Sequence, residues 1–137
     1  MFTGLSIVQM NGSDSVEITS PSYPSNYPNN VDMTWIIQCE ENQKVRVNFS
    51  SFETERNYDF LRAGDVDSIY SGEFFKWHGD KEPPDLISYG NEMWLRFTSD
   101  GSVTRSGFSL WASCVPSIGE FSFSRSTILN KFAICMV

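Results

Sequence analysis

The side chains best suited to chemistry in this 137-residue chain are carboxylates that stand in two loops. One acidic segment, FETERNYD, spans residues 52–59, and Asp100 stands in the polar run SDGSVTRS, which spans residues 99–106. Carboxylate oxygens can bind hard cations or accept hydrogen bonds from Lys and Arg. Most loop carboxylates are simply solvated turn residues, so both interpretations remain open at this point.

Catalytic chemistry has little support in the sequence. His78 is the only histidine, which excludes a histidine-rich zinc site. A Ser-His-Asp triad would have to use His78, which stands in a loop-rich segment without a nucleophile motif. No feature marks a carboxylate with a raised pKa or a sugar cleft, as a glycosidase would need. We therefore expect a protein that is not an enzyme.

Composition indicates one globular domain with a genuine hydrophobic core, because 40% of residues are hydrophobic and 15% are aromatic. The formal net charge of −7 argues against nucleic acid or an anionic membrane as the main partner. No apolar run approaches the roughly 18–20 residues that a membrane-spanning helix needs.

The hydrophobic pattern predicts short strands rather than helices. Apolar residues at alternating positions mark six strands. In chain order, the strands contain Val16 and Ile18; Trp35, Ile37 and Cys39; Val45, Val47 and Phe49; residues 60–64; Met93, Leu95 and Phe97; and Phe108, Leu110 and Ala112. Residues 65–92 hold several Gly and Pro and are expected to be rich in loops. The strand spacing predicts an antiparallel sandwich or barrel.

Six pieces of sequence, in order, resemble the CUB domain family across residues 12–114. They are SPSYPSNYP (20–28), Trp35-x-Ile37, Val47-x-Phe49-x-x-Phe52-x-x-Glu55, Tyr58-Asp59-Phe60, a run with Gly90, Asn91, Trp94, Leu95, Phe97, Ser99, Asp100 and Ser102, and Gly107-Phe108. The resemblance implies an all-β, spermadhesin-like sandwich of two antiparallel sheets, an extracellular setting and a role in recognition. Residues 1–11 would then be an N-terminal extension, and residues 115–137 a tail or linker.

The same resemblance implies a Ca2+ site. Its side-chain ligands would be Glu55, Asp59 and Asp100, with main-chain oxygens near Ser102 and Val103. Tyr27, which precedes a proline, would hydrogen-bond the carboxylates from behind. The segment between Glu55 and Asp59 is shorter than in calcium-binding members, and Glu53 would replace Glu55 if the register differed by two residues. The alternative is a solvated acidic loop without a cation.

The three cysteines depart from the family pattern of two bridges. The family's second cysteine falls on Met33, and its later pair falls near Arg56 and His78. By strand parity Cys39 and Cys114 both point inward, which permits a bridge but does not establish it. The alternative is two buried free thiols, and Cys135 is left over in either case.

Two Asn-x-Ser tripeptides, at Asn11 and Asn48, match the pattern for N-linked glycosylation, provided that the chain is secreted. Asn48 lies on the outward parity of its strand.

These expectations combine into one function and two alternatives. The chain would be a secreted recognition module in which Ca2+ orders the acidic loops and their carboxylates accept Lys or Arg from a protein partner. One alternative is a calcium-independent carbohydrate-binding module that uses exposed aromatic residues among Trp77, Trp94 and Trp111, the last two on outward parity. The other is a structural spacer domain within a larger secreted protein.

Overall fold

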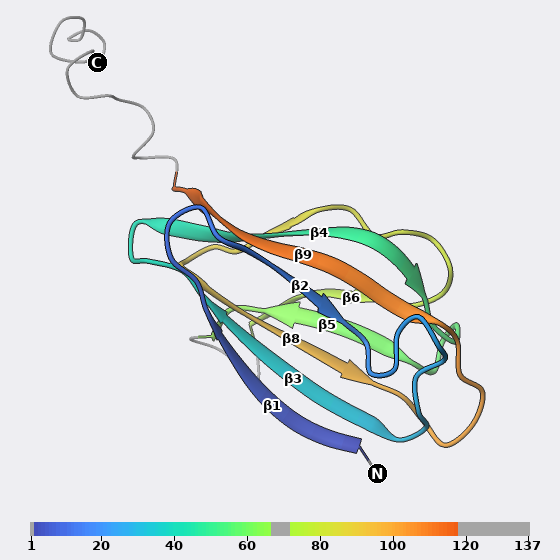
Figure 1. The fold of residues 1–137 in the computed structure, drawn as a ribbon. Helices are drawn as coiled ribbons and strands as arrows, with labels where there is room; N and C mark the ends of the chain where they lie inside the picture. Colours follow the sequence, from blue (N-terminus) through green and yellow to red (C-terminus); the bar gives the residue numbers. More distant parts are fainter. Residues whose placement is uncertain (1, 67–71, 118–137) are drawn as a thin grey trace, which may run out of the picture.

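Two β-sheets pack face to face in the computed structural model, which describes residues 2–66 and 72–117 (Figure 1). One sheet has five strands in the order β1-β3-β8-β5-β6, and the other has four in the order β2-β9-β4-β7. The strands are β1 (Phe2–Gln9), β2 (Ser15–Thr19), β3 (Val31–Gln38), β4 (Gln43–Glu53), β5 (Phe60–Gly64), β6 (Glu73–Trp77), β7 (Leu86–Ile87), β8 (Glu92–Thr98) and β9 (Gly107–Pro116). Within this described part no helix is long and apolar enough to cross a membrane.

The alternating apolar residues form the core between the sheets, as the sequence pattern predicts. The fully buried inward positions include Ile37 on β3, Val45 and Val47 on β4, Leu95 on β8 and Leu110 on β9. A strand points successive side chains to opposite faces, so one apolar residue in two is enough to line each inner face. The all-β sandwich predicted from the sequence is therefore confirmed.

Three strands were not predicted. β6 and β7 lie within residues 65–92, where only loops were expected. The consecutive aromatics Phe74 and Phe75 break the alternation of β6, and β7 pairs with β4 through only two residues, Leu86 and Ile87. Such short strands carry too little pattern to stand out from the surrounding loop.

The third unpredicted strand, β1, lies within residues 1–11, which were expected to be an N-terminal extension. It forms the edge of the five-stranded sheet and runs parallel to β3, whereas the other strand pairs are antiparallel. Gly4 lies opposite Met33, and the Met33 side chain occupies the space that a Cβ on residue 4 would need. The next residue after the strand, Met10, is fully buried.

A disulfide joins Cys39, just after β3, to Cys114 on β9, with the two Cα atoms 5.7 Å apart. The bridge ties the five-stranded sheet to the four-stranded sheet and closes a sequence separation of 75 residues. Cys135 and the rest of residues 118–137 lie outside the described residues. The expected tail therefore begins within a strand, because β9 continues to Pro116.

Hydrogen bonds link the two segments in which the family's later cysteine pair would fall. The backbone N–H of Asn57 donates to Nδ1 of His78 at 3.1 Å, and Arg56 pairs with Asp80 at 3.2 Å. The backbone N–H of Thr54 donates to the carbonyl of Gly79 at 2.9 Å, and the Thr54 hydroxyl accepts from the Gly79 N–H at 3.1 Å. The loop after β4 is thus held to the segment after β6 without a covalent bond.

Candidate calcium site

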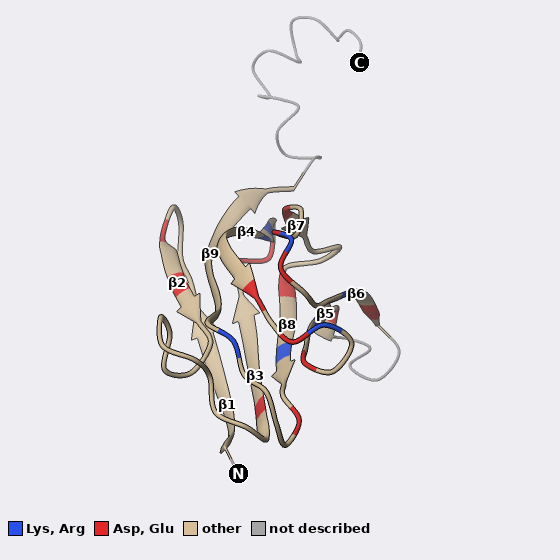
Figure 2. Cartoon of the chain, turned by 90° about the vertical axis from the view of Figure 1, so that its right-hand side faces the viewer, with Lys and Arg blue, Asp and Glu red and all other residues tan. Residues whose placement is uncertain are grey.

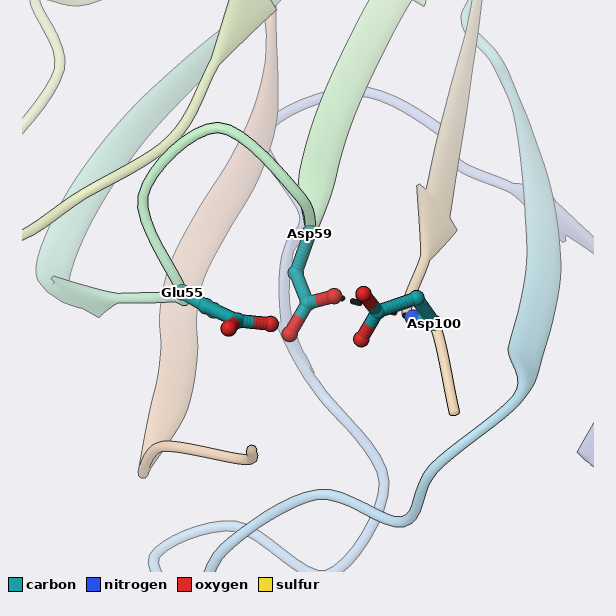
Figure 3. A group of neighbouring side chains, drawn as sticks. All are labelled: Glu55, Asp59 and Asp100. Carbon is teal, nitrogen blue, oxygen red and sulfur yellow. Dashed lines mark hydrogen bonds between the residues drawn. The ribbon is translucent and has the colours of Figure 1, made fainter. Parts of the chain in front are cut away.

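Three carboxylates converge at one end of the sandwich (Figure 3). Glu55 and Asp59 flank the turn between β4 and β5, and Asp100 follows β8. β5 and β8 are paired, with Phe60 opposite Thr98, so the residue before β5 and those after β8 meet at the same sheet edge. One carboxylate oxygen from each residue lies within 4.8 Å of the others. Figure 3 shows the carboxyl groups pointing toward one another from two loops.

The turn that carries Glu55 and Asp59 is closed by its own backbone. The carbonyl of Glu55 accepts the N–H of Tyr58 at 3.3 Å and that of Asp59 at 3.1 Å. Asn57 has a φ of 70°, a left-handed conformation that Asn adopts more readily than most residues. The turn from Glu55 to Asp59, although short, therefore reverses the chain enough to bring both carboxylates to the same side of the turn.

The buried side chain of Tyr27 connects Asp59 and Glu55 from the core side of the site. Its hydroxyl donates to Oδ2 of Asp59 at 2.6 Å and accepts the backbone N–H of Glu55 at 3.0 Å. The ring is buried and packs edge-on against Phe97 at a centroid distance of 4.9 Å. This is the position behind the carboxylates that the resemblance implied for Tyr27.

Asp100 is fixed mainly through its backbone. Its N–H donates to Oδ1 of Asp59 at 2.9 Å, and its carbonyl accepts the N–H of Asn30 at 2.8 Å. Oδ1 of Asp100 accepts the backbone N–H of Ser102 at 3.3 Å. Val103 follows with a φ of 61°, so the chain bends sharply just past the site. The structure thus places both residues expected to supply main-chain oxygens in the loop directly after Asp100.

Glu55, rather than Glu53, belongs to the cluster. Oε1 of Glu53 instead accepts the hydroxyl of Ser106 at 3.2 Å. Glu53, the alternative considered from the sequence, therefore lies outside the group of converging carboxylates.

The electrostatics of the cluster are unfavourable without a cation. Burial first, and then the charges of Asp100 and Asp59, raise the pKa of Glu55. Burial also raises the pKa of Asp59, although hydrogen bonds from Tyr27 and from the Asp100 N–H oppose that shift. Burial and the bond to Asp59 raise the pKa of Tyr27 well above its ordinary value, so it stays a neutral donor. Oε1 of Glu55 is buried and has no hydrogen-bond partner among the described residues.

The residues present fit a calcium ion. Calcium binds about six to eight oxygens at roughly 2.3–2.6 Å, and three carboxylates with loop carbonyls and water can supply that number. A divalent cation would remove the mutual repulsion of the carboxylates and give the orphaned Oε1 of Glu55 a partner. The set offers only oxygen ligands, which suit calcium, and it contains neither Cys nor His, which typical zinc sites use.

Sequence reasoning missed Arg105, which comes close enough to Glu55 to lower its pKa slightly against the other influences. Arg105 also lines a polar cavity of about 140 Å³ together with Glu53, Thr54, Arg56, Gly79 and Asp80. Its position in the loop after β8 gave no signal in the sequence, since an Arg in a polar loop is ordinary.

His78 has a structural position. Its Nδ1 accepts a backbone hydrogen bond from Asn57, and its ring packs edge-on against Phe60 at 5.3 Å. These contacts give the His78 ring a structural role in holding the turn before β5.

The tryptophans do not form the patch that the carbohydrate alternative would use. Trp94 lies on β8 and Trp111 on β9, which belong to different sheets. Trp94 is buried, with its ring over Gly64, and Trp77 is half-buried and stacked on Phe75. Trp111 alone is exposed among these three. Strand parity gave the correct face for Trp94 but could not reveal that the face is covered.

A family model for the CUB domain matches residues 9–111. Bone morphogenetic protein 1 of Xenopus laevis is 39% identical over 101 residues, which cover 71% of this chain and 14% of that protein. Human neuropilin-2 is 39% identical over 107 residues, which cover 74% of this chain and 12% of that protein. The chain thus spans only a small part of the length of these relatives.

Solved structures agree with the match. The full extracellular region of zebrafish Gpr126/Adgrg6 has a TM-score of 0.71 at 28% identity, covering 80% of this chain and 14% of that one. The MASP-1 CUB2 domain bound to Ca2+ has a TM-score of 0.67 at 24% identity, covering 77% of this chain and 95% of that one. The chain belongs to the CUB domain family, whose members are in general non-catalytic interaction modules of extracellular proteins.

Proposed function

We propose that this domain works outside the cell, binds Ca2+ through Glu55, Asp59 and Asp100, and uses the ordered loops to accept a Lys or Arg from a protein partner. The observation that carries the proposal is the convergence of three carboxylate oxygens within 4.8 Å. Oε1 of Glu55, buried without a hydrogen-bond partner in the described residues, supports binding of a cation at this position.

Each residue has a separate task in this proposal. The three carboxylates supply charged oxygens, and main-chain oxygens of Ser102 and Val103 would complete the shell with water. Tyr27 holds Asp59 and the Glu55 backbone in place, as groups behind metal ligands commonly do. When bound, the ion would supply positive charge that fixes both loops.

A basic partner fits the charges of the chain. Asp and Glu number 17 against 10 Lys and Arg, and Figure 2 shows the acidic positions spread over strands and loops at several parts of the molecule. Asp100 and Glu55 are only half-buried, so oxygen edges not used by the ion remain reachable. A partner ammonium or guanidinium would form charge-assisted hydrogen bonds there, and binding would weaken as salt concentration rises.

The test is a calorimetric titration of Ca2+ into the wild type and into Asp100→Ala, with thermal melting in calcium and in chelator. We expect heat of binding and a higher melting temperature with calcium for the wild type, and neither effect for the variant. Glu41→Gln is a control because Glu41 is an exposed acidic residue in the turn between β3 and β4, at the other end of the sandwich (Figure 1). A wild type without heat or melting shift would refute the calcium mechanism.

One observation keeps the carbohydrate-binding alternative in view, namely the exposed ring of Trp111 on the outer face of the four-stranded sheet. Sugar binding that survives Asp100→Ala but is lost in Trp111→Ala would favour it. If neither change affects binding of any kind, the spacer alternative gains.

A further inference from the structure

We propose that Asn48 carries an N-linked glycan and that the first sugar of this glycan stacks on the indole of Trp111. The inference rests on the extracellular setting proposed above, but it is independent of calcium. It concerns the outer face of the four-stranded sheet, away from the acidic loops.

The strand register brings the two residues together. Asn48 on β4 lies directly opposite Trp111 on β9, and Glu17 on β2 lies on the other side of Trp111. Val47 and Phe49, which flank Asn48 on β4, are buried in the core, so the side chain of Asn48 points outward. Directly opposed residues in antiparallel strands have Cβ atoms about 4.5–5.5 Å apart. A sugar attached to Asn48 therefore starts beside the indole.

The surroundings leave the ring open. Trp111 is 40% exposed, whereas Trp35 and Trp94 are at most 7% exposed. The residues two positions away along β9 are Ser109 and Ser113, whose side chains are too small to cover the indole. An isolated apolar ring on a polar sheet face gains from a neighbour that can shield it.

In the acceptor tripeptide Asn48-Phe49-Ser50, the outward-facing side chain of Asn48 is half-buried. Ser50 is exposed, and the pairing register of β4 with β9 shifts between Phe49 and Ser51, which leaves residue 50 without a cross-strand partner. Within residues 2–66 and 72–117 the side-chain amide of Asn48 makes no hydrogen bond. Neither group is thus needed to hold the sheet.

The modification needs a lipid-linked oligosaccharide diphosphate and its transferase, which the secretory pathway supplies. The amide nitrogen of Asn48 forms a bond to the anomeric carbon of the first sugar. The bond between that carbon and the diphosphate oxygen breaks, the lipid diphosphate leaves with the electron pair, and the amide nitrogen loses one proton. The apolar face of the attached N-acetylglucosamine can then lie on the indole.

Asn11 provides an internal comparison. It has the same acceptor pattern but stands in an exposed turn with Gly12, Ser13 and Asp14, where its N–H bonds the Asp14 carboxylate at 3.3 Å. A glycan there would have no ring beside it in that turn. The two acceptors therefore separate the general effect of a glycan from the effect of stacking.

The experiment uses the full chain secreted from glycosylating eukaryotic cells. Mass spectrometry after enzymatic deglycosylation, which converts a glycosylated Asn to Asp, reports occupancy at each acceptor. Ser50→Ala removes the Asn48 acceptor while it keeps the Asn48 side chain, and Asn11→Gln removes the other acceptor. Both are then combined with Trp111→Ala.

Two readouts report stacking. Acrylamide quenching of tryptophan fluorescence depends mainly on Trp111, because it is the most exposed of the four tryptophans. We expect occupancy at Asn48, a quenching slope clearly smaller with the Asn48 glycan than without it, and a melting temperature that is several degrees higher. In Trp111→Ala the glycan should no longer raise the melting temperature, and removing the Asn11 acceptor should change neither readout.

An unoccupied Asn48 in the secreted protein would overturn the proposal. So would an Asn48 glycan whose effect on melting is the same with and without Trp111. Failure here leaves the calcium titration unaffected, because that test concerns residues at the loop end of the sandwich.

Discussion

The hydroxyl of Tyr27 donates to the Asp59 carboxylate at 2.6 Å from a fully buried ring. It also accepts the Glu55 N–H, so one side chain sets the spacing of two candidate calcium ligands. The acidic loops are therefore anchored to the core by Tyr27 without the help of a cation.

Tyr27→Phe should weaken calcium binding about tenfold, since loss of a group that orients a metal ligand typically costs 10–100-fold in affinity. It should also lower the free energy of unfolding in metal-free buffer by about 1–3 kcal/mol, because the Glu55 N–H is left without its partner. Calorimetry and urea unfolding measure the two effects. Unchanged affinity in a folded variant would show that the Tyr27 hydroxyl does not support the site.

Calcium stabilisation should depend on pH. Without a cation the pKa values of Glu55 and Asp59 are raised in the folded state, so the folded state binds protons more tightly than the unfolded state. The metal-free fold therefore becomes more stable as pH falls through the raised folded pKa values of these two groups toward the ordinary values of about 4, because the penalty for ionising them is lost. Calcium needs the deprotonated carboxylates, so its affinity falls over the same range.

The difference in melting temperature between calcium-loaded and metal-free protein should consequently shrink as pH falls from about 7 to about 4.5. Metal should be removed by resin, since chelators themselves lose affinity in acid. The Asp32–Arg96 pair, in which the Arg96 hydrogen bond lowers the pKa of Asp32, acts equally on both samples and cancels. A difference that grows in acid would contradict the assignment of the carboxylates as ligands.

The double change Cys39→Ala with Cys114→Ala should reduce the free energy of unfolding substantially. Closing a sequence separation of 75 residues restricts the unfolded chain by about 4.5 kcal/mol in the loop-entropy model. Urea unfolding under oxidising conditions measures the loss, and the reduced wild type should match the variant. Wild type that unfolds at the same urea concentration with and without reductant would argue against the bridge.

His78→Ala should loosen the turn that carries Glu55 and Asp59, because the Asn57 N–H loses its acceptor. We expect a loss of about 1 kcal/mol in stability and weaker calcium binding. His78→Asn keeps an acceptor oxygen on a short side chain and should recover part of both. If Asn restores nothing, packing of the imidazole on Phe60, rather than the hydrogen bond, holds this turn.

The sequence predicted the parts of the fold that depend on local pattern. Alternation identified the inward faces of β3, β4, β8 and β9, and the resemblance to CUB domains identified Glu55, Asp59 and Asp100 as one group. The burial of Trp94 did not follow, because parity names a face and not what covers it. Here Gly64, across the strand pair, leaves room for the indole.

Long-range pairing was equally hidden. The parallel docking of β1 on β3 depends on a register between residues about 30 positions apart, such as Gly4 with Met33, and no local period encodes it. The contact between Asp59 and the Asp100 N–H likewise follows from the pairing of β5 with β8.

The course of β9 has a consequence for how the domain can be presented. The strand starts at Gly107, just after the loop that carries Asp100, and continues for 10 residues to Pro116. At about 3.4 Å per residue it spans roughly 30 Å, so the chain leaves the sandwich at the end remote from the acidic loops (Figure 1). Within the described residues, the last turn of the chain out of β9 and the candidate calcium ligands therefore lie at opposite ends of the sandwich, whereas the start of β1 lies near the ligands, because the N–H of Phe2 donates to Asn30 and that of Asn30 to Asp100.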